Sequence, residues 1–182
     1  MRFLAGLVFG ILALGAAAAF FVTSGVMNAG AMLPPGKLEA RIAHFALNRS
    51  VSRRAPKIEN PAGKDADAIK AGGEHYKEMC VVCHGAPGVD ASEIGEGLNP
   101  PAPDLTLERV QRRSDGELYW IVQNGIRMSG MPSFGPTHKD RQIWEIVAFL
   151  RHLPSLTPEE QKVLAAANRE NEEKEQKEKG KD

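Results

Sequence analysis

The chain has 182 residues, and its 23 basic and 23 acidic side chains give a formal net charge of zero. A protein that binds nucleic acid by neutralising phosphates carries a basic excess, so we expect no nucleic-acid partner. The two cysteines are too few for a scaffold of several disulfides or for a four-cysteine zinc site. Aromatic residues make up 6% of the chain, so a core built from side chains alone would be thin.

The first segment is apolar enough to span a membrane. Phe3–Val22 contains seventeen apolar residues, three glycines and no charge. As a helix it would be about 30 Å long, which matches the hydrocarbon thickness of a bilayer. A cleaved signal peptide is the alternative, with Ala29-Gly30-Ala31 as a small-residue cleavage site, although the apolar run exceeds a typical signal core. We predict a transmembrane anchor in residues 1–33, and either alternative carries the rest of the chain across the membrane.

Residues 34–64 form a basic segment after this anchor. Leu38, Ile42 and Phe45 recur at helical spacing among Lys and Arg residues. Such a helix could lie on anionic lipid headgroups, or it could pack on the domain or on a partner subunit, which is the interpretation we favour. Arg53–Lys64 contains two prolines and a glycine, and we predict that it is a linker.

The most informative motif is Cys80-Val81-Val82-Cys83-His84, which has the C-x-x-C-H form of covalent c-type haem attachment. Positions i and i+3 of a helical turn lie on one face, so both thiols can reach the vinyl groups along one porphyrin edge. His84 follows directly and can place a neutral imidazole against the iron as the proximal ligand. A redox-active dithiol, a plain disulfide and half of a zinc site are the alternatives, although neither a βαβ pattern nor a second pair of zinc ligands is visible.

An iron held by one histidine needs a second axial ligand or keeps an open position. Methionine is expected for electron transfer, because a thioether raises the reduction potential. Met128 and Met131 follow the motif, and Met131 stands between Gly130 and Pro132. A methionine in such a turn is a poor filler of a core. We therefore predict Met131 as the distal ligand.

Residues 69–153 resemble the monohaem c-type cytochromes of the cytochrome c domain family. The resemblance rests on the motif with its following glycine and on Pro100–Leu105, Ser114–Ile121, Asn124–Ile126, Gly130–Pro132 and Trp144–Leu150. It implies an all-α class, with a small cytochrome c fold of three to four helices around one covalently bound haem c in residues 65–155. It also implies that a proline carbonyl after the motif accepts a hydrogen bond from His84. Pro100 and Pro101 are the matching residues, and we assign Pro101.

Local signals place the helices of this domain. Asp65–Cys83 is predicted to be a helix with the motif at its end. Ser114–Glu117 is a capping box that opens a helix ending near Asn124. Thr137 is predicted to cap the next helix, which stops before Pro154. Its buried face is expected to hold four apolar residues at helical spacing: Ile143, Ile146, Val147 and Leu150.

A pair of glycines interrupts the first of these helices. Each glycine weakens a helix by about 1 kcal/mol relative to alanine, so we expect Gly72-Gly73 to permit the close approach of another helix. Trp144 or Phe149 is the predicted contact. Three short helices with few aromatics should not be stable alone, so we also expect the chain without haem to be largely unfolded.

Residues 156–182 are predicted to be a charged tail, either helical or disordered. Thr157–Glu160 can start a helix with proline at its first position. Arg169–Asp182 contains five basic residues, six acidic residues and no apolar residue. A solvated, frayed helix is the interpretation we favour, and a docking tail for a partner is the alternative.

Together these observations predict a monohaem c-type cytochrome anchored by one helix in the bacterial inner membrane, with its haem domain in the periplasm. It would carry single electrons between respiratory-chain partners, with His84 and Met131 as iron ligands in both oxidation states. We expect no small-molecule substrate and no catalytic residue. The alternatives are a haem c subunit of a larger membrane-bound oxidoreductase complex, a haem-based gas or redox sensor, and a haem-free dithiol oxidoreductase.

Overall fold

The computed structural model describes residues 2–26 and 28–179. The chain divides after Leu33 into two units, which are described separately. The first unit contains α1 (Arg2–Thr23), none of whose side chains is buried. Within α1, a window of 18 residues has a mean hydropathy of 2.3. This helix is long and apolar enough to cross a membrane, a property that it shares with signal sequences near an N-terminus.

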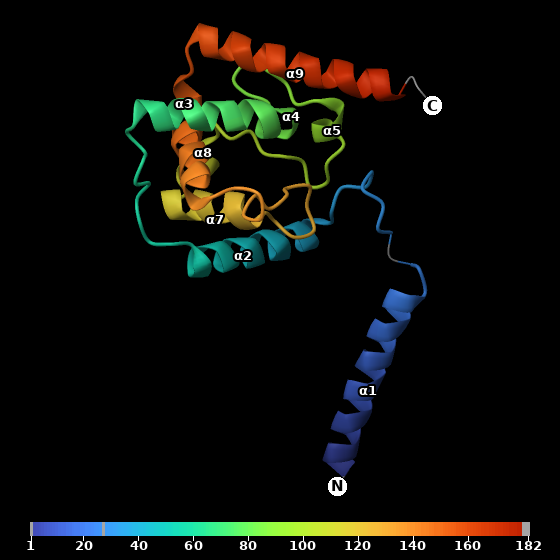
Figure 1. The fold of residues 1–182 in the computed structure, drawn as a ribbon. Helices are drawn as coiled ribbons and strands as arrows, with labels where there is room; N and C mark the ends of the chain where they lie inside the picture. Colours follow the sequence, from blue (N-terminus) through green and yellow to red (C-terminus); the bar gives the residue numbers. More distant parts are fainter. Residues whose placement is uncertain (1, 27, 180–182) are drawn as a thin grey trace. The chain divides into compact units, whose positions relative to one another are not determined.

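The second unit is helical (Figure 1). Its longer helices are α2 (Lys37–Arg54), α3 (Ala66–His75), α7 (Asp115–Asn124), α8 (Asp140–His152) and α9 (Pro158–Lys179). Its shorter elements are the π-helical turn η1 (Tyr76–Cys80), α4 (Val81–His84), α5 (Glu93–Glu96), α6 (Glu108–Gln111) and the 3₁₀ turn η2 (Leu153–Ser155). No strand is present among the residues that the structure describes, so the predicted all-α class is confirmed.

The helix α8 is the centre of this unit, because α3 crosses it and α7 also packs against it (Figure 1). Every residue from 143 to 150 is buried, including the four that the sequence places on the buried face. The core around α8 is completed by Tyr76, Val81, Val110, Leu118, Tyr119, Val122, Leu153, Leu156 and Leu164. Burial of this apolar surface is the main force that holds the short helices together.

The crossing of α3 and α8 depends on Gly72. A Cβ atom at this position would lie 1.9 Å from the carbonyl oxygen of Glu145, so the two backbones are in direct contact. At Gly73, a Cβ would lie 3.0 Å from the ring of Phe149. The predicted close approach is thus confirmed, with Phe149 as the contact. Trp144 points elsewhere and stacks on Tyr119, with 4.3 Å between the ring centroids.

Both predicted ends of α7 are correct, whereas for α8 the predicted stop before Pro154 is correct and the predicted start is wrong. The Ser114–Glu117 capping box is formed, and Gly125 ends α7 with a φ of 64°. The expectation that Thr137 caps α8 is wrong, because the hydroxyl of Thr137 donates to the carbonyl of Phe134 in a separate turn. The helix begins at Asp140, three residues after Thr137, with Lys139 as the N-cap.

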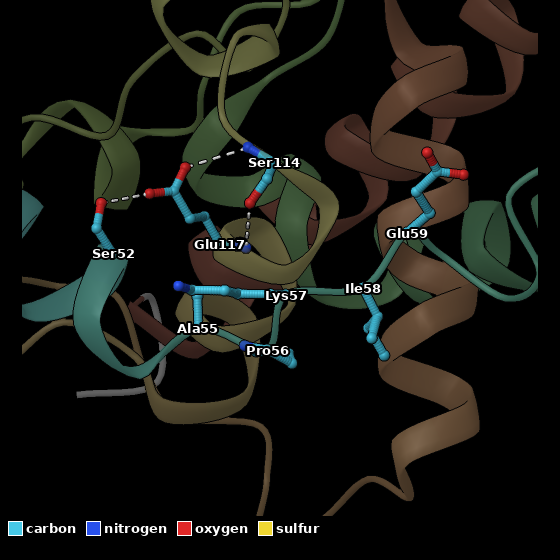
Figure 2. Close-up of a pocket in the computed structure, with 8 residues that line it drawn as sticks. All are labelled: Ser52, Ala55, Pro56, Lys57, Ile58, Glu59, Ser114 and Glu117. Carbon is cyan, nitrogen blue, oxygen red and sulfur yellow. Dashed lines mark hydrogen bonds between the residues drawn. The ribbon is translucent and has the colours of Figure 1, made fainter.

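The helix α2 packs on α7. Val51 is fully buried, and the Ser52 hydroxyl donates to the Glu117 carboxylate at 2.7 Å. Figure 2 shows these contacts beside a pocket formed by the end of α2, the segment that follows it and the start of α7. The carboxylate of Glu117 also accepts a hydrogen bond from the backbone N–H of Ser114. One end of α2 is therefore fixed to the helical domain.

The predicted linker after α2 is not a flexible spacer. It has no regular secondary structure from Ala55 to Asp65 apart from turns, but it packs on α7 and α8. The Asn60 side chain donates to the carbonyl of Trp144 at 2.8 Å, and its backbone N–H donates to Asp115 at 2.9 Å. These hydrogen bonds join residues far apart in the sequence. Composition reports only on neighbouring residues, so it indicated a linker and gave no sign of this packing.

The helix α9 lies over α4 and the turn η1 (Figure 1). Its predicted start is correct, since the Thr157 hydroxyl accepts from the N–H of Glu160, whose carboxylate accepts from Thr157 in return. Leu164 is buried, and the Asn168 side chain donates to the carbonyl of Asp90 at 2.9 Å. The first half of α9 is therefore part of the packed domain, in contrast to a solvated tail.

Candidate functional site

The C-x-x-C-H motif lies where the π-helical turn η1 passes into α4. Cys80 is the last residue of η1, and Cys83 and His84 belong to α4. Burial, with a smaller contribution from Cys83, raises the pKa of Cys80 from 9.0 to about 12. A catalytic dithiol needs a lowered pKa, so this environment argues against the dithiol oxidoreductase alternative.

His84 is held in one orientation by the loop that follows the motif. Its Nδ1 lies 2.8 Å from the carbonyl oxygen of Pro103. A carbonyl can only accept, so Nδ1 carries the proton and Nε2 keeps the lone pair that binds a metal. Burial lowers the pKa of His84, and the hydrogen bond to Pro103 acts in the opposite direction. The side chain is thus prepared as a neutral imidazole ligand.

This hydrogen bond corrects the sequence-based assignment of Pro101. Pro100 and Pro101 are both exposed, whereas Pro103 is half-buried and supplies the carbonyl that accepts from His84. The sequence pattern shows three prolines within four residues, and it does not show how far the loop runs before it turns back to the imidazole. That distance depends on the packing of the loop.

Tyr76 holds the end of the haem motif through a second hydrogen bond. Its hydroxyl donates to the carbonyl oxygen of Gly85 at 2.6 Å, inside the core. Burial raises the pKa of Tyr76, so the phenol stays protonated and remains a donor. Gly85 has a φ of 58°, and a Cβ there would lie 2.3 Å from the carbonyl of Val89. The residue after His84 must therefore be glycine. The sequence predicts Tyr76 within a helix but contains no signal for this contact.

Met131 and Met128 have different surroundings. The carbonyl of Met131 accepts from the N–H of Ile126 at 3.2 Å, and its own N–H donates to the Ser129 hydroxyl at 3.2 Å. These bonds hold Met131, which is half-buried, in a defined turn. The side chain of Met128 is 92% exposed and its φ is +60°. Of the two methionines, Met131 is the one that the fold holds in place.

Glycine contacts connect the Met131 loop to the haem motif. Gly95 at α5 lies against Cys83, because a Cβ on Gly95 would be 3.0 Å from the Cα of Cys83. Three residues later, the side chain of Leu98 contacts Gly130. A Cβ added to Gly130 would lie 2.4 Å from the Leu98 side chain. The segment after the motif therefore contacts both the cysteine turn and the residue next to Met131. Residues 48 positions apart, Cys83 and Met131, are brought to one region of the fold.

A zinc site is not formed by the described part of the chain, in which no three His, Cys, Asp or Glu residues are grouped to hold a metal ion. The rings of His75 and His138 pack against each other, with 5.2 Å between their centroids, but they do not belong to such a group of metal-binding residues. Two thiols, a neutral imidazole with an oriented Nδ1 and a thioether in a nearby turn fit a haem, since sulfur and imidazole are its usual protein partners.

Comparison with known proteins agrees with this geometry. Residues 67–150 match the family model described as cytochrome c oxidase, cbb3-type, subunit III. The chain contains a cytochrome c domain. The matched range covers the motif, the Pro103 loop, Met131 and the buried face of α8, and it confirms the resemblance found over residues 69–153. A cytochrome c domain is a haem-binding, electron-transferring unit.

One curated relative is a quinohemoprotein alcohol dehydrogenase, ADH IIB, from Pseudomonas putida. It is 26% identical over 129 residues, which is 65% of this chain and 17% of the relative. This chain therefore spans about one sixth of that protein. The name of that relative describes a hemoprotein, which agrees with the cytochrome c domain matched in this chain.

Proposed function

We propose that the protein is a membrane-anchored monohaem c-type cytochrome that carries single electrons between respiratory-chain partners. The observation that carries this proposal is the fixed His84 imidazole, with Nδ1 bonded to Pro103, directly after two thiols in one helical turn. The chain has a single C-x-x-C-H motif and two cysteines, so one haem is attached. When bound, the haem supplies one-electron redox chemistry.

In this proposal the side chains of the domain bind the haem, orient it and shield it. Cys80 and Cys83 would hold the haem through thioether bonds, and His84 would offer it the lone pair of Nε2. Met131 presents its thioether from the loop after α7. With His84 and Met131 both bound to the iron, no position would remain on it for a substrate, so we expect no catalytic residue. A ligand set that stays the same in both oxidation states also favours rapid electron exchange.

The helix α1 supports placement in the bacterial inner membrane, with the cytochrome domain in the periplasm. Its length and hydropathy suit a single span, and the cytochrome domain follows it in the chain. An anchor of this kind raises the effective concentration of the haem near membrane-bound donors and acceptors. Fractionation of native cells distinguishes an uncleaved anchor from a removed signal peptide. Only a protein that keeps its anchor sediments with the membranes and needs detergent to be extracted.

A second candidate is a haem c subunit of a larger membrane-bound oxidoreductase complex. The matching family model describes an oxidase subunit, and the relative is an enzyme of which this chain spans 17%. Purification from native membranes in a mild detergent distinguishes the two. A subunit co-purifies with partners in fixed stoichiometry, whereas a free carrier elutes alone.

The ligand set is tested with Met131→Ala and the control Met128→Ala. We expect the wild-type reduced protein to bind no CO, and Met131→Ala to bind CO and to have a lower reduction potential, because the thioether that raises it is lost. Met128→Ala should match the wild type, since its side chain is 92% exposed. CO binding by the wild type would instead support the gas-sensor alternative, and an unchanged Met131→Ala would remove Met131 as a ligand.

A further inference from the structure

The helix α2 has two distinct faces. Its inner face is made by Ala40, Leu47, Ser50 and Val51, which are half-buried or buried. At about 100° per residue these four positions fall on one side of the helix. Val51 packs in the domain, and hydrogen bonds from Ser52 to Glu117 and from Arg113 to Asn48 fasten the helix to α7 and the residues before it. This face is fully explained by the fold.

The outer face of α2 is apolar but exposed. Leu38, Ile42 and Phe45 are 70%, 60% and 69% exposed. Their spacing of four and three residues places them in one stripe, about 180° from the Leu47 and Val51 side. Three large apolar side chains in one exposed stripe mark an interaction surface. We call this set the Leu38–Phe45 stripe.

Basic residues surround this stripe. By helical position, Arg41, Arg49 and Arg53 lie on or beside the same face. The helix as a whole contains five basic residues and one acidic residue, Glu39, in a chain of zero net charge. The carboxylate of Glu39 accepts the N–H of Gly36 at the start of the helix. The outer face therefore combines apolar insertion with positive charge, which is the chemistry that recognises an anionic bilayer surface.

The position of α2 in the chain agrees with this occupant. Thirteen residues separate the end of α1 at Thr23 from Lys37. Even fully extended, they reach at most about 45 Å. If α1 spans a membrane, the start of α2 stays within that distance of the bilayer, and the tether raises its effective concentration at the headgroups.

We propose that α2 is an interfacial helix, whose Leu38–Phe45 stripe inserts between the headgroups of an anionic bilayer while its inner face holds the cytochrome domain. This inference rests on the proposed membrane anchoring. It goes beyond anchoring because a second contact with the bilayer fixes which side of the cytochrome domain faces the membrane. A flexible tether would leave the domain free to turn.

The experiment uses the full haem-loaded chain, reconstituted as single copies in lipid nanodiscs. One set of discs contains phosphatidylcholine, and a second contains phosphatidylcholine mixed with phosphatidylglycerol. Hydrogen–deuterium exchange is followed by mass spectrometry for peptides covering residues 37–48, with α7 as the internal reference. We expect slower deuterium uptake in the mixed discs than in phosphatidylcholine discs or detergent, and a partial return of uptake at high salt.

The test variant is Leu38→Ser/Ile42→Ser/Phe45→Ser, which should lose the protection. The matched control is Ile58→Ser/Val163→Ser, which removes apolar side chains of similar exposure, 55% and 53%, outside the Leu38–Phe45 stripe. Both variants should exchange like the wild type in detergent, which establishes that α2 is still folded.

Equal uptake in detergent and in both kinds of disc would overturn the inference and assign the stripe to a protein partner. Protection that survives the triple substitution would overturn it as well. Failure of the anchoring is recognised separately, because the chain would then not co-elute with the discs at all. Failure of the haem assignment would appear as a colourless protein.

Discussion

Replacement of Gly72 by alanine tests the helix crossing that supports the haem motif. The added Cβ would lie 1.9 Å from Glu145 O and 2.5 Å from Glu145 C, both backbone atoms of the buried helix α8. Real Cβ contacts below 3.0 Å essentially do not occur, so α3 and α8 must separate by about 1 Å. Overpacking of this kind costs about 1–3 kcal/mol, and a backbone obstacle places the cost at the upper end.

A gain in helix propensity opposes this cost. Replacing glycine by alanine within a helix returns about 1 kcal/mol, so the net loss in the free energy of unfolding is about 2 kcal/mol. The packed unit is residues 34–182, and for a unit of about 150 residues a loss of about 2 kcal/mol lowers the melting temperature by about 4–8 °C. The measurement is denaturant unfolding of the haem-loaded chain in detergent, followed by far-UV circular dichroism.

Gly73→Ala is the matched control in the same helix. Its Cβ would meet the ring of Phe149 at 3.0 and 3.1 Å, and a ring edge can turn aside where a backbone cannot. The small clash and the gain in propensity should nearly cancel. Equal unfolding midpoints for Gly72→Ala and Gly73→Ala would refute the backbone contact between α3 and α8.

Three further predictions concern the motif and α9. Tyr76→Phe should lower the free energy of unfolding by about 1–2 kcal/mol, because the buried carbonyl of Gly85 loses its donor, and denaturant titration measures the change. Cys80→Ala/Cys83→Ala should abolish haem attachment and most of the domain's helical circular dichroism, and native helicity without haem would contradict this expectation. Hydrogen bonds at the start of α9 lower the pKa of Glu160 below its usual 4.5, so its contribution to stability is complete above that pH and is lost as the pH falls through the lowered value. Glu160→Gln cannot titrate, so its α9 should show a smaller fall in stability on acidification than the wild type. Hydrogen exchange of α9 peptides from the two proteins measures this difference.

Local chemistry made the haem motif recognisable, and the family match over residues 67–150 agrees with it. The cysteine spacing, the adjacent His84 and the glycine pair are contiguous signals, and the fold confirms the close approach that the glycines indicate. The start of α7 was predictable for the same reason, since a capping box is formed by residues three positions apart. The predicted cap of α8 was wrong because the helix begins at Asp140 with Lys139 as its N-cap, which leaves Thr137 in the separate turn before it.

Residues distant in the sequence could not be assigned in this way. The choice of Pro103 over Pro101 depends on the path of a loop, and the choice of Phe149 over Trp144 depends on how α7 packs beside α8. Leu164 was assigned to a tail because residues 156–182 as a whole are highly charged, although its own neighbours Val163 and Ala165–Ala167 are apolar. Each of these outcomes is set by distances between elements, which no local pattern contains.

The amino-acid sequence by itself determined the haem-binding chemistry, the helical class and the apolar first segment, because each is written in neighbouring residues. Only the tertiary structure decided which proline orients His84, that α9 covers the motif, and which face of α2 is left exposed. The physical reason is that burial and hydrogen bonding between separate helices arise only when the whole domain packs around α8.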